Sequence, residues 1–145
     1  MFLLRIKNFI TTLLAVLLVA VVMLLTRGIQ SSRFPSLTGN RTFYLQSPSS
    51  QAWIREELTL LNQFLVKGES IVLPCENREE TLAKIIEEYD AVLLFEECAG
   101  ESVSYYFYTP KWTDGVTIGG VFVNLHVAFN GKQCAVGAPL IFGGF

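Results

Sequence analysis

An uninterrupted apolar segment near the N-terminus constrains this chain more than any other feature. The run Phe9–Thr26, FITTLLAVLLVAVVMLLT, contains no charged residue. Its 18 residues, at a helical rise of 1.5 Å each, extend over about 27 Å, close to the ~30 Å hydrocarbon thickness of a bilayer. The run therefore predicts a transmembrane helix at residues 9–26, preceded by a short tail, residues 1–8, with the basic side chains Arg5 and Lys7.

Two interpretations of this segment stay open. An uncleaved signal anchor fits its length, which exceeds the 7–15 apolar residues of an ordinary secretory signal. A cleaved signal needs small residues at the cleavage site, and Thr26-Arg27-Gly28 is a poor site. We expect a single-pass anchor in the cell membrane, with the short tail in the cytoplasm and the C-terminal part outside it. Arg27, Arg33 and Arg41 beyond the run leave the positive-inside rule undecided.

The rest of the chain is long enough for one domain. Residues 27–40 are rich in Ser, Pro and Gly and predict a linker, followed by a domain at residues 41–145. Three of the 11 basic residues precede Gly28, so eight remain against all 13 acidic residues, a net charge of −5. A domain of this sign repels phosphate backbones, so nucleic-acid binding is not predicted. The composition suits a bacterial cell-envelope protein.

Local patterns predict an α+β domain. Arg41–Gln46 is rich in β-branched and aromatic residues and predicts a strand. Ser47–Ser50 offers a capping hydroxyl and a proline for the first turn of a helix that continues to Leu58. Lys67-Gly68-Glu69 predicts a hairpin turn between two strands, although the first of these, Thr59–Val66, also fits a longer helix.

The clearest predicted element is a helix at Arg78–Tyr89. Asn77 and Glu80 form a capping pair, and apolar side chains recur from Leu82 to Tyr89 at helical spacing. Strands follow it, and Asn130-Gly131 is a strong hairpin signal. The strands are Ala91–Glu97, Val103–Thr109, Val116–Ile118, Val121–Phe129 and Gln133–Phe142. The predicted order is β-α-β-β-α-β followed by C-terminal hairpins, with two helices on a mainly antiparallel sheet.

Two surfaces are candidates for binding a partner. Alternation places Asn124 and His126 on the same sheet face, opposite an apolar stripe. In the aromatic tract, alternation places Tyr106 and Tyr108 together, and Trp112 follows in a turn. Amphipathic aromatic rings of this kind suit a glycan, a peptide or the membrane interface.

The three cysteines have no metal-ligand spacing, so neither a metal site nor any other cofactor is predicted. Outside the cytoplasm, Cys75 and Cys98 are the better pair for a disulfide, since each lies at the end of a segment. Cys134 shares a strand face with Val136, which predicts a buried thiol.

Two classes of function follow from these patterns. We expect a membrane-anchored, non-enzymatic domain that binds another protein or a component of the cell envelope. The alternative is a small thiol-dependent hydrolase or redox enzyme that uses Cys134 or Cys98 with His126. The enzyme interpretation requires an accessible thiol of low pKa close to the histidine.

Overall fold

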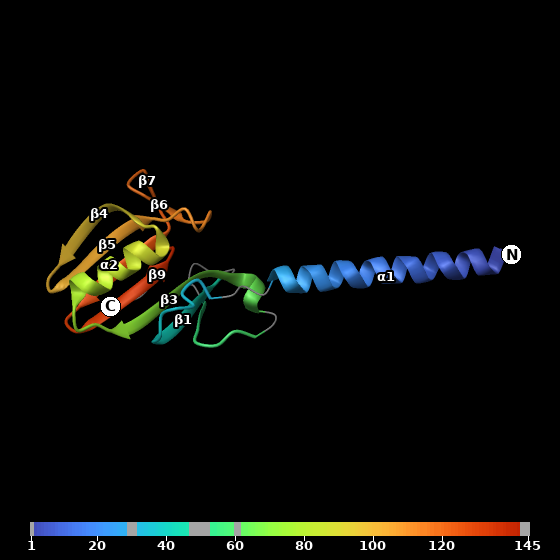
Figure 1. Cartoon of the computed structure of the whole chain (residues 1–145), viewed down its shortest axis with the longest axis horizontal. Coiled ribbons are helices and arrows are strands. Elements are labelled where there is room, and N and C mark those ends of the chain that lie inside the picture. The colour runs from blue at the N-terminus through green and yellow to red at the C-terminus, as the bar shows by residue number, and fades with distance from the viewer. Residues whose placement is uncertain (1, 29–31, 47–52, 60–61, 143–145) are drawn as a thin grey trace. The chain divides into compact units, whose positions relative to one another are not determined.

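The computed structural model describes residues 2–28, 32–46, 53–59 and 62–142 (Figure 1). The chain divides into two compact units, Met1–Ser31 and Ser32–Phe145. The first unit contains the helix α1, Phe2–Gly28. The second contains the sheets and the helix α2, Arg78–Tyr89.

The helix α1 confirms the predicted N-terminal apolar helix. Its window Ile6–Met23 has a mean hydropathy of 2.2, and none of this window is buried by the protein itself. The hydroxyls of Thr11 and Thr12 donate to the carbonyl oxygens of Lys7 and Asn8, so these polar groups are satisfied inside the helix. The helix is long and apolar enough to cross a membrane, as is the helix of a signal sequence.

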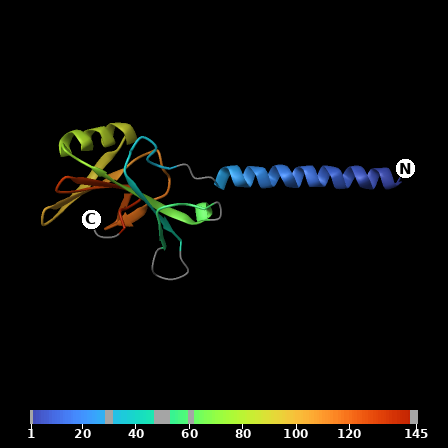
Figure 2. The ribbon, with the colours of Figure 1, turned by 90° about the horizontal axis from the view of Figure 1, so that it is seen from below.

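The domain is built on a seven-stranded antiparallel sheet. Its strand order is β2-β1-β3-β9-β8-β5-β4, and β6 and β7 form a separate two-stranded sheet. Figure 2 shows the strong twist of the larger sheet. The strands are β1 Asn40–Leu45, β2 Trp53–Arg55, β3 Val66–Pro74, β4 Val92–Ala99, β5 Ser102–Tyr108, β6 Val116–Ile118, β7 Val121–Val123, β8 Leu125–Asn130 and β9 Gln133–Ala138.

The helix α2 lies on one face of this sheet, here called the helix face (Figure 2). Its predicted cap is confirmed, because the Asn77 side chain accepts a hydrogen bond from the Glu80 amide at 3.2 Å. Ile85 and Tyr89 are buried and pack with Val127 and Phe107 of the sheet. The α+β class and the antiparallel sheet are therefore confirmed. The opposite side of the sheet is called the open face.

The helix predicted from Ser47 to Leu58 is wrong where the structure describes it. Trp53, Ile54 and Arg55 form β2 and pair with Leu45, Tyr44 and Phe43 of β1. The order β-α-β-β-α-β is therefore also wrong, and the described residues of the domain contain one α-helix. The residues that supplied the predicted helix cap, 47–52, lie outside the described part of the chain.

The hairpin turn predicted at Lys67-Gly68-Glu69 is also wrong, because β3 runs straight through it. Gly68 and Glu69 pair with Tyr44 and Phe43 of β1, Glu69 also pairs with Ala138 of β9, and the register with β1 shifts at Lys67. A Cβ atom at Gly68 would lie 3.0 Å from the Ala138 carbonyl oxygen, so glycine serves close packing here and not a turn. A short 3₁₀ helix, η1 Asn62–Leu65, precedes the strand.

The C-terminal hairpin signal is confirmed. Gly131 has a φ of 57° in the turn between β8 and β9, a conformation that favours glycine. The predicted last strand ends early, at Ala138, before a cis bond to Pro139. The predicted strand Val121–Phe129 is divided in two, with Asn124 between β7 and β8.

The packed domain begins at Ser32, ahead of the predicted start at Arg41. Phe34 is fully buried, and its ring packs edge-on against Tyr89 and Trp112. Glu69 on β3 accepts hydrogen bonds from the Ser32 hydroxyl at 2.6 Å and the Arg33 amide at 2.8 Å. Ser and Pro in this stretch therefore belong to a docked segment, and the second half of the predicted linker is part of the domain.

Candidate functional site

The open face carries a row of side chains that crosses six strands. The residues opposite each other in this row, here called the central row, are Thr42, Ser70, Gly137, His126, Tyr106 and Phe95. The rings of Phe95 and Tyr106 are stacked with centroids 4.4 Å apart, and Tyr106 is stacked on His126 at the same distance. Three aromatic rings thus form a continuous stack across β4, β5 and β8.

His126 lies under the C-terminal segment, which folds back over the open face. The Ile141 amide donates to Nδ1 of His126 at 3.2 Å, so the ring proton resides on Nε2. The histidine is 8% exposed, and Nε2 has no hydrogen-bond partner among the described residues. Burial lowers the pKa of His126 to about 4, which keeps the ring neutral at physiological pH.

Further contacts hold the C-terminal segment in this position. The Tyr44 hydroxyl donates to the Phe142 carbonyl oxygen at 2.7 Å, and the rings of Tyr44 and Phe142 are in contact. A Cβ atom at Gly137 would lie 2.6 Å from the backbone nitrogen of Ile141, so this glycine allows the segment to touch the sheet. The middle of the open face is therefore covered by the chain itself.

The part of the open face near β4 stays accessible. Tyr106 is half-buried, and its hydroxyl donates to Glu97 at 3.0 Å. Burial and then this hydrogen bond raise the pKa of Tyr106. Tyr108 is exposed and contacts Phe122 of β7. The predicted pairing of Tyr106 with Tyr108 on one face agrees with the register, since each pairs with an open-face residue of β4.

Asn124 is not accessible, and Trp112 is half-buried against the core. Asn124 is fully buried, and its amide side chain bonds the backbone of Thr109 at 2.7 and 2.8 Å and the Trp112 carbonyl oxygen at 2.9 Å. Trp112 packs against Phe34 and Tyr89. The asparagine therefore fixes the loop after β5 and places the tryptophan beside the core.

The thiol–imidazole pair of the enzyme hypothesis does not form. Cys134 is opposite Phe129 on the helix face, whereas His126 is on the open face. Burial raises the pKa of the Cys134 thiol to about 12, so the thiol stays protonated. Cys98 is exposed, but it lies near the C-terminal end of β4. It is three residues beyond Phe95, the residue of β4 that shares the central row with His126.

The predicted disulfide between Cys75 and Cys98 is wrong, and both are free thiols. Cys75 directly follows β3, and three strands separate β3 from β4. Four strand spacings of about 4.8 Å exceed the roughly 7 Å between Cα atoms that a disulfide tolerates. Sequence position alone suggested the pair, because strand order was unknown.

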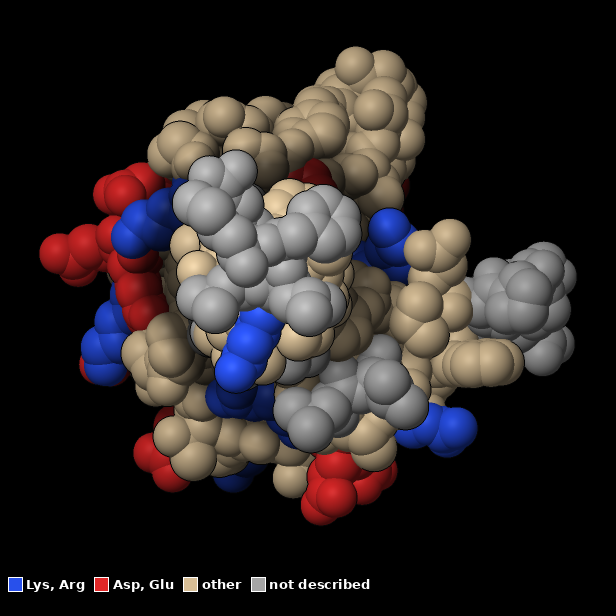
Figure 3. Space-filling view, turned by 90° about the vertical axis from the view of Figure 1, so that its right-hand side faces the viewer, with Lys and Arg blue, Asp and Glu red and all other residues tan. Residues whose placement is uncertain are grey.

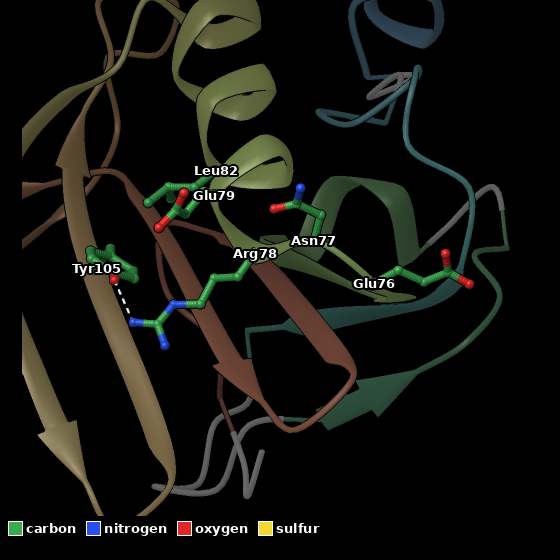
Figure 4. A pocket seen from close by; sticks show the side chains of 6 residues that line it. All are labelled: Glu76, Asn77, Arg78, Glu79, Leu82 and Tyr105. Atoms are coloured by element: carbon green, nitrogen blue, oxygen red, sulfur yellow. Dashed lines mark hydrogen bonds between the residues drawn. The ribbon is translucent and has the colours of Figure 1, made fainter.

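A depression of about 610 Å³ lies at the start of α2 (Figure 4). Arg78 crosses it and donates to the Tyr105 hydroxyl at 2.6 Å, with its guanidinium over the Tyr105 and Phe129 rings. Within the described part of the chain, the Arg78 guanidinium is thus engaged by side chains of the domain itself. Among the described residues, no three His, Cys, Asp or Glu side chains come together as a metal site would require.

Sequence reasoning missed several residues of this surface. Phe95 completes the ring stack, and Phe122 covers Tyr108. Both lie in apolar stretches that were assigned to strands as a whole. Comparison with protein-family models, with curated proteins and with solved structures finds no match to this chain.

Proposed function

We propose that this protein is a single-pass membrane protein whose C-terminal domain is a non-enzymatic binding module. Its ligand is an extended, basic segment of another protein that adds as a strand to the outer edge of β4. One observation carries this proposal: β4 is an edge strand, and its stretch Phe95–Ala99 has no neighbour on the outer side among the described residues.

This edge is only partly protected against pairing, because its charges, Glu96 and Glu97, are both acidic and repel an acidic strand but not a basic one. No proline or lysine occurs in Phe95–Ala99, and both are common protective residues on edge strands. The other edge strand, β2, has only three residues. Such an edge offers main-chain hydrogen bonds to an incoming strand, which is the usual mode of β-strand addition.

The charges at the edge select the partner. Glu96 and Glu97 are adjacent and exposed, and neither forms an ion pair with another described residue. They favour Lys or Arg in the added segment, through electrostatic complementarity. The stacked rings of Phe95 and Tyr106 lie beside them and provide apolar area for the alternate side chains of the ligand.

Photo-crosslinking tests this interface in the cells that make the protein. A benzophenone amino acid at Ala99, in the same edge stretch, should trap a discrete protein adduct, and the same probe at Ala83 on the exposed side of α2 should not. Reversal of both edge charges, Glu96→Lys with Glu97→Lys, should abolish the adduct. The matched reversal Glu79→Lys with Glu87→Lys on α2 should leave it intact. Absence of an adduct at the edge, or identical adducts at Ala83, would contradict the proposal.

The side of the membrane is a separate part of the proposal. The shortness of the stretch ahead of the apolar run, residues 1–8, is typical of a signal anchor with its N-terminus in the cytoplasm, and it supports an orientation with the domain outside the cytoplasm, in the cell envelope of a bacterium. Alkaline phosphatase fused after Phe145 should be active, and a fluorescent protein at the same position should be dark. The opposite result would place the domain in the cytoplasm.

A further inference from the structure

We propose that one end of the domain rests in the head-group region of the same bilayer that α1 spans, with the β6–β7 hairpin as its most deeply inserted part. This inference deepens the proposed function and rests on its membrane anchor. It starts from the distribution of exposed apolar side chains along the sheet.

The exposed large hydrophobic residues of the described domain all lie on one side of the central row. This side, here called the apolar end, is where β3 and β4 begin and β5 ends. Part of the set is on β2, η1 and the start of β4, namely Trp53, Ile54, Phe64, Leu65, Val92 and Leu93. Scattered surface hydrophobics are ordinary, but a set confined to one end indicates an interaction surface.

Of the rest of the set, Tyr108, Val121 and Phe122 lie on or beside the small sheet, and Phe142 packs against β1. Tyr108 pairs with Val92 two residues beyond the central row, and its ring contacts Phe122. Val121 and Phe122 are 39% and 41% exposed, and Phe142 is in contact with Tyr44, which pairs with Gly68 at the start of β3.

The hairpin itself is suited to a lipid interface. Residues 116–123 read VTIGGVFV and contain no charged side chain. Gly119 and Gly120, with φ of 57° and 85°, make its tight turn. In Figure 3, the uppermost part of the molecule, where Figure 1 places this hairpin, carries neither basic nor acidic side chains. Tyr and Trp, which the apolar end also exposes, are enriched at membrane–water interfaces.

The chain enters the domain at this same end. Ser32 and Arg33 bind Glu69, one residue from the central row on the apolar side. The Arg33 guanidinium also bonds Asp114 at 2.5 Å, two residues before β6. Only residues 29–31 separate Gly28 from Ser32, and an extended chain of that length covers at most about 14 Å. The head-group layer is itself about 5–8 Å deep on each side, so this connection keeps the entry point close to the bilayer.

Acidic side chains gather at the other end of the sheet. Glu96 and Glu97 on β4 lie beyond the central row, and Glu101 follows in the turn to β5. These three carboxylates are thus held away from anionic lipid head groups, and the acids near the apolar end, Asp90 and Asp114, are ion-paired with Lys111 and Arg33. This arrangement also leaves the outer edge of β4, where we place the protein ligand, away from the membrane.

Spin-label accessibility in the full chain tests this inference. Nitroxide labels are placed by Phe122→Cys in the hairpin, Glu101→Cys at the acidic end and Val16→Cys in α1, each in a Cys98→Ser background and in phosphatidylcholine vesicles. Collision rates are measured with oxygen, which partitions into lipid, and with a water-soluble nickel chelate. The label at 122 should collide with nickel several times less often than the label at 101. Val121→Cys should repeat the result at an independent position.

The label at Val16 separates failure of this inference from failure of the anchor. If position 16 favours oxygen while 121 and 122 are as accessible to nickel as 101, the anchor holds and the inserted hairpin is refuted. If position 16 is itself accessible to nickel, the membrane anchor is refuted, and the inference with it.

Discussion

Replacing Phe34 by alanine tests whether the chain immediately after α1 is a structural part of the domain. The side chain is fully buried, with ring centroids 5.7 Å from Tyr89 and 5.6 Å from Trp112. Removal of a buried phenyl ring loses its transfer free energy and leaves a cavity, which together cost about 3–5 kcal/mol. We expect Phe34→Ala to lower the free energy of unfolding by this amount.

Urea titration of the full chain in detergent micelles measures the effect, with tryptophan fluorescence as the signal, because Trp112 touches the Phe34 ring. The matched control is Phe64→Ala, since Phe64 is 54% exposed and should change the unfolding free energy by less than about 1 kcal/mol. If Phe34→Ala unfolds within about 1 kcal/mol of the wild type, residues 32–34 are a linker and the docking argument fails.

Three further predictions concern the open face and the thiols. Between pH 6.5 and pH 4 the unfolded chain protonates His126 while the folded chain does not, so the folded state loses stability as the pH falls. Urea titrations should show the wild type losing about 3 kcal/mol of unfolding free energy from pH 7 to pH 4 relative to the His126→Gln variant. Parallel pH curves for the two proteins would refute this. Gly137→Ala should lower the unfolding free energy by about 1–3 kcal/mol, because its Cβ atom meets the backbone of Ile141; an unchanged urea midpoint would show that the C-terminal segment is not packed there. Iodoacetamide should label Cys98 rapidly and Cys134 only after unfolding; fast labelling of Cys134 in the folded protein would restore the enzyme hypothesis.

Local signals predicted the elements that local interactions determine. The helix α2 has a cap at Asn77 and a complete apolar stripe, and the turn at Asn130-Gly131 requires a positive φ that glycine supplies. The strand β2 was missed because a helix-cap pattern precedes it, whereas pairing with β1 determines its conformation. Tertiary pairing outweighs local propensity in short segments of this kind.

The candidate site was predicted only in part, for a related reason. Alternation correctly placed Tyr106 and Tyr108 on one face, because period-2 geometry is a property of the strand alone, but it could not show that the register brings His126 against Tyr106. It also could not show that residues 139–142 fold back over His126, or that the Asn124 side chain is hydrogen-bonded to the backbone of Thr109. Phe34 was missed because its neighbours are Ser, Arg and Pro, and only the assembled core reveals its pocket.

Fractionation of cells followed by intact mass measurement tests the membrane anchor most directly. Membranes are washed with alkaline carbonate, which strips peripheral proteins, and the retained protein is weighed by mass spectrometry. An uncleaved anchor predicts that the 16.2 kDa chain, with α1 intact, stays in the membrane pellet. A soluble, shorter chain that begins after α1 would identify a cleaved signal sequence and contradict the account.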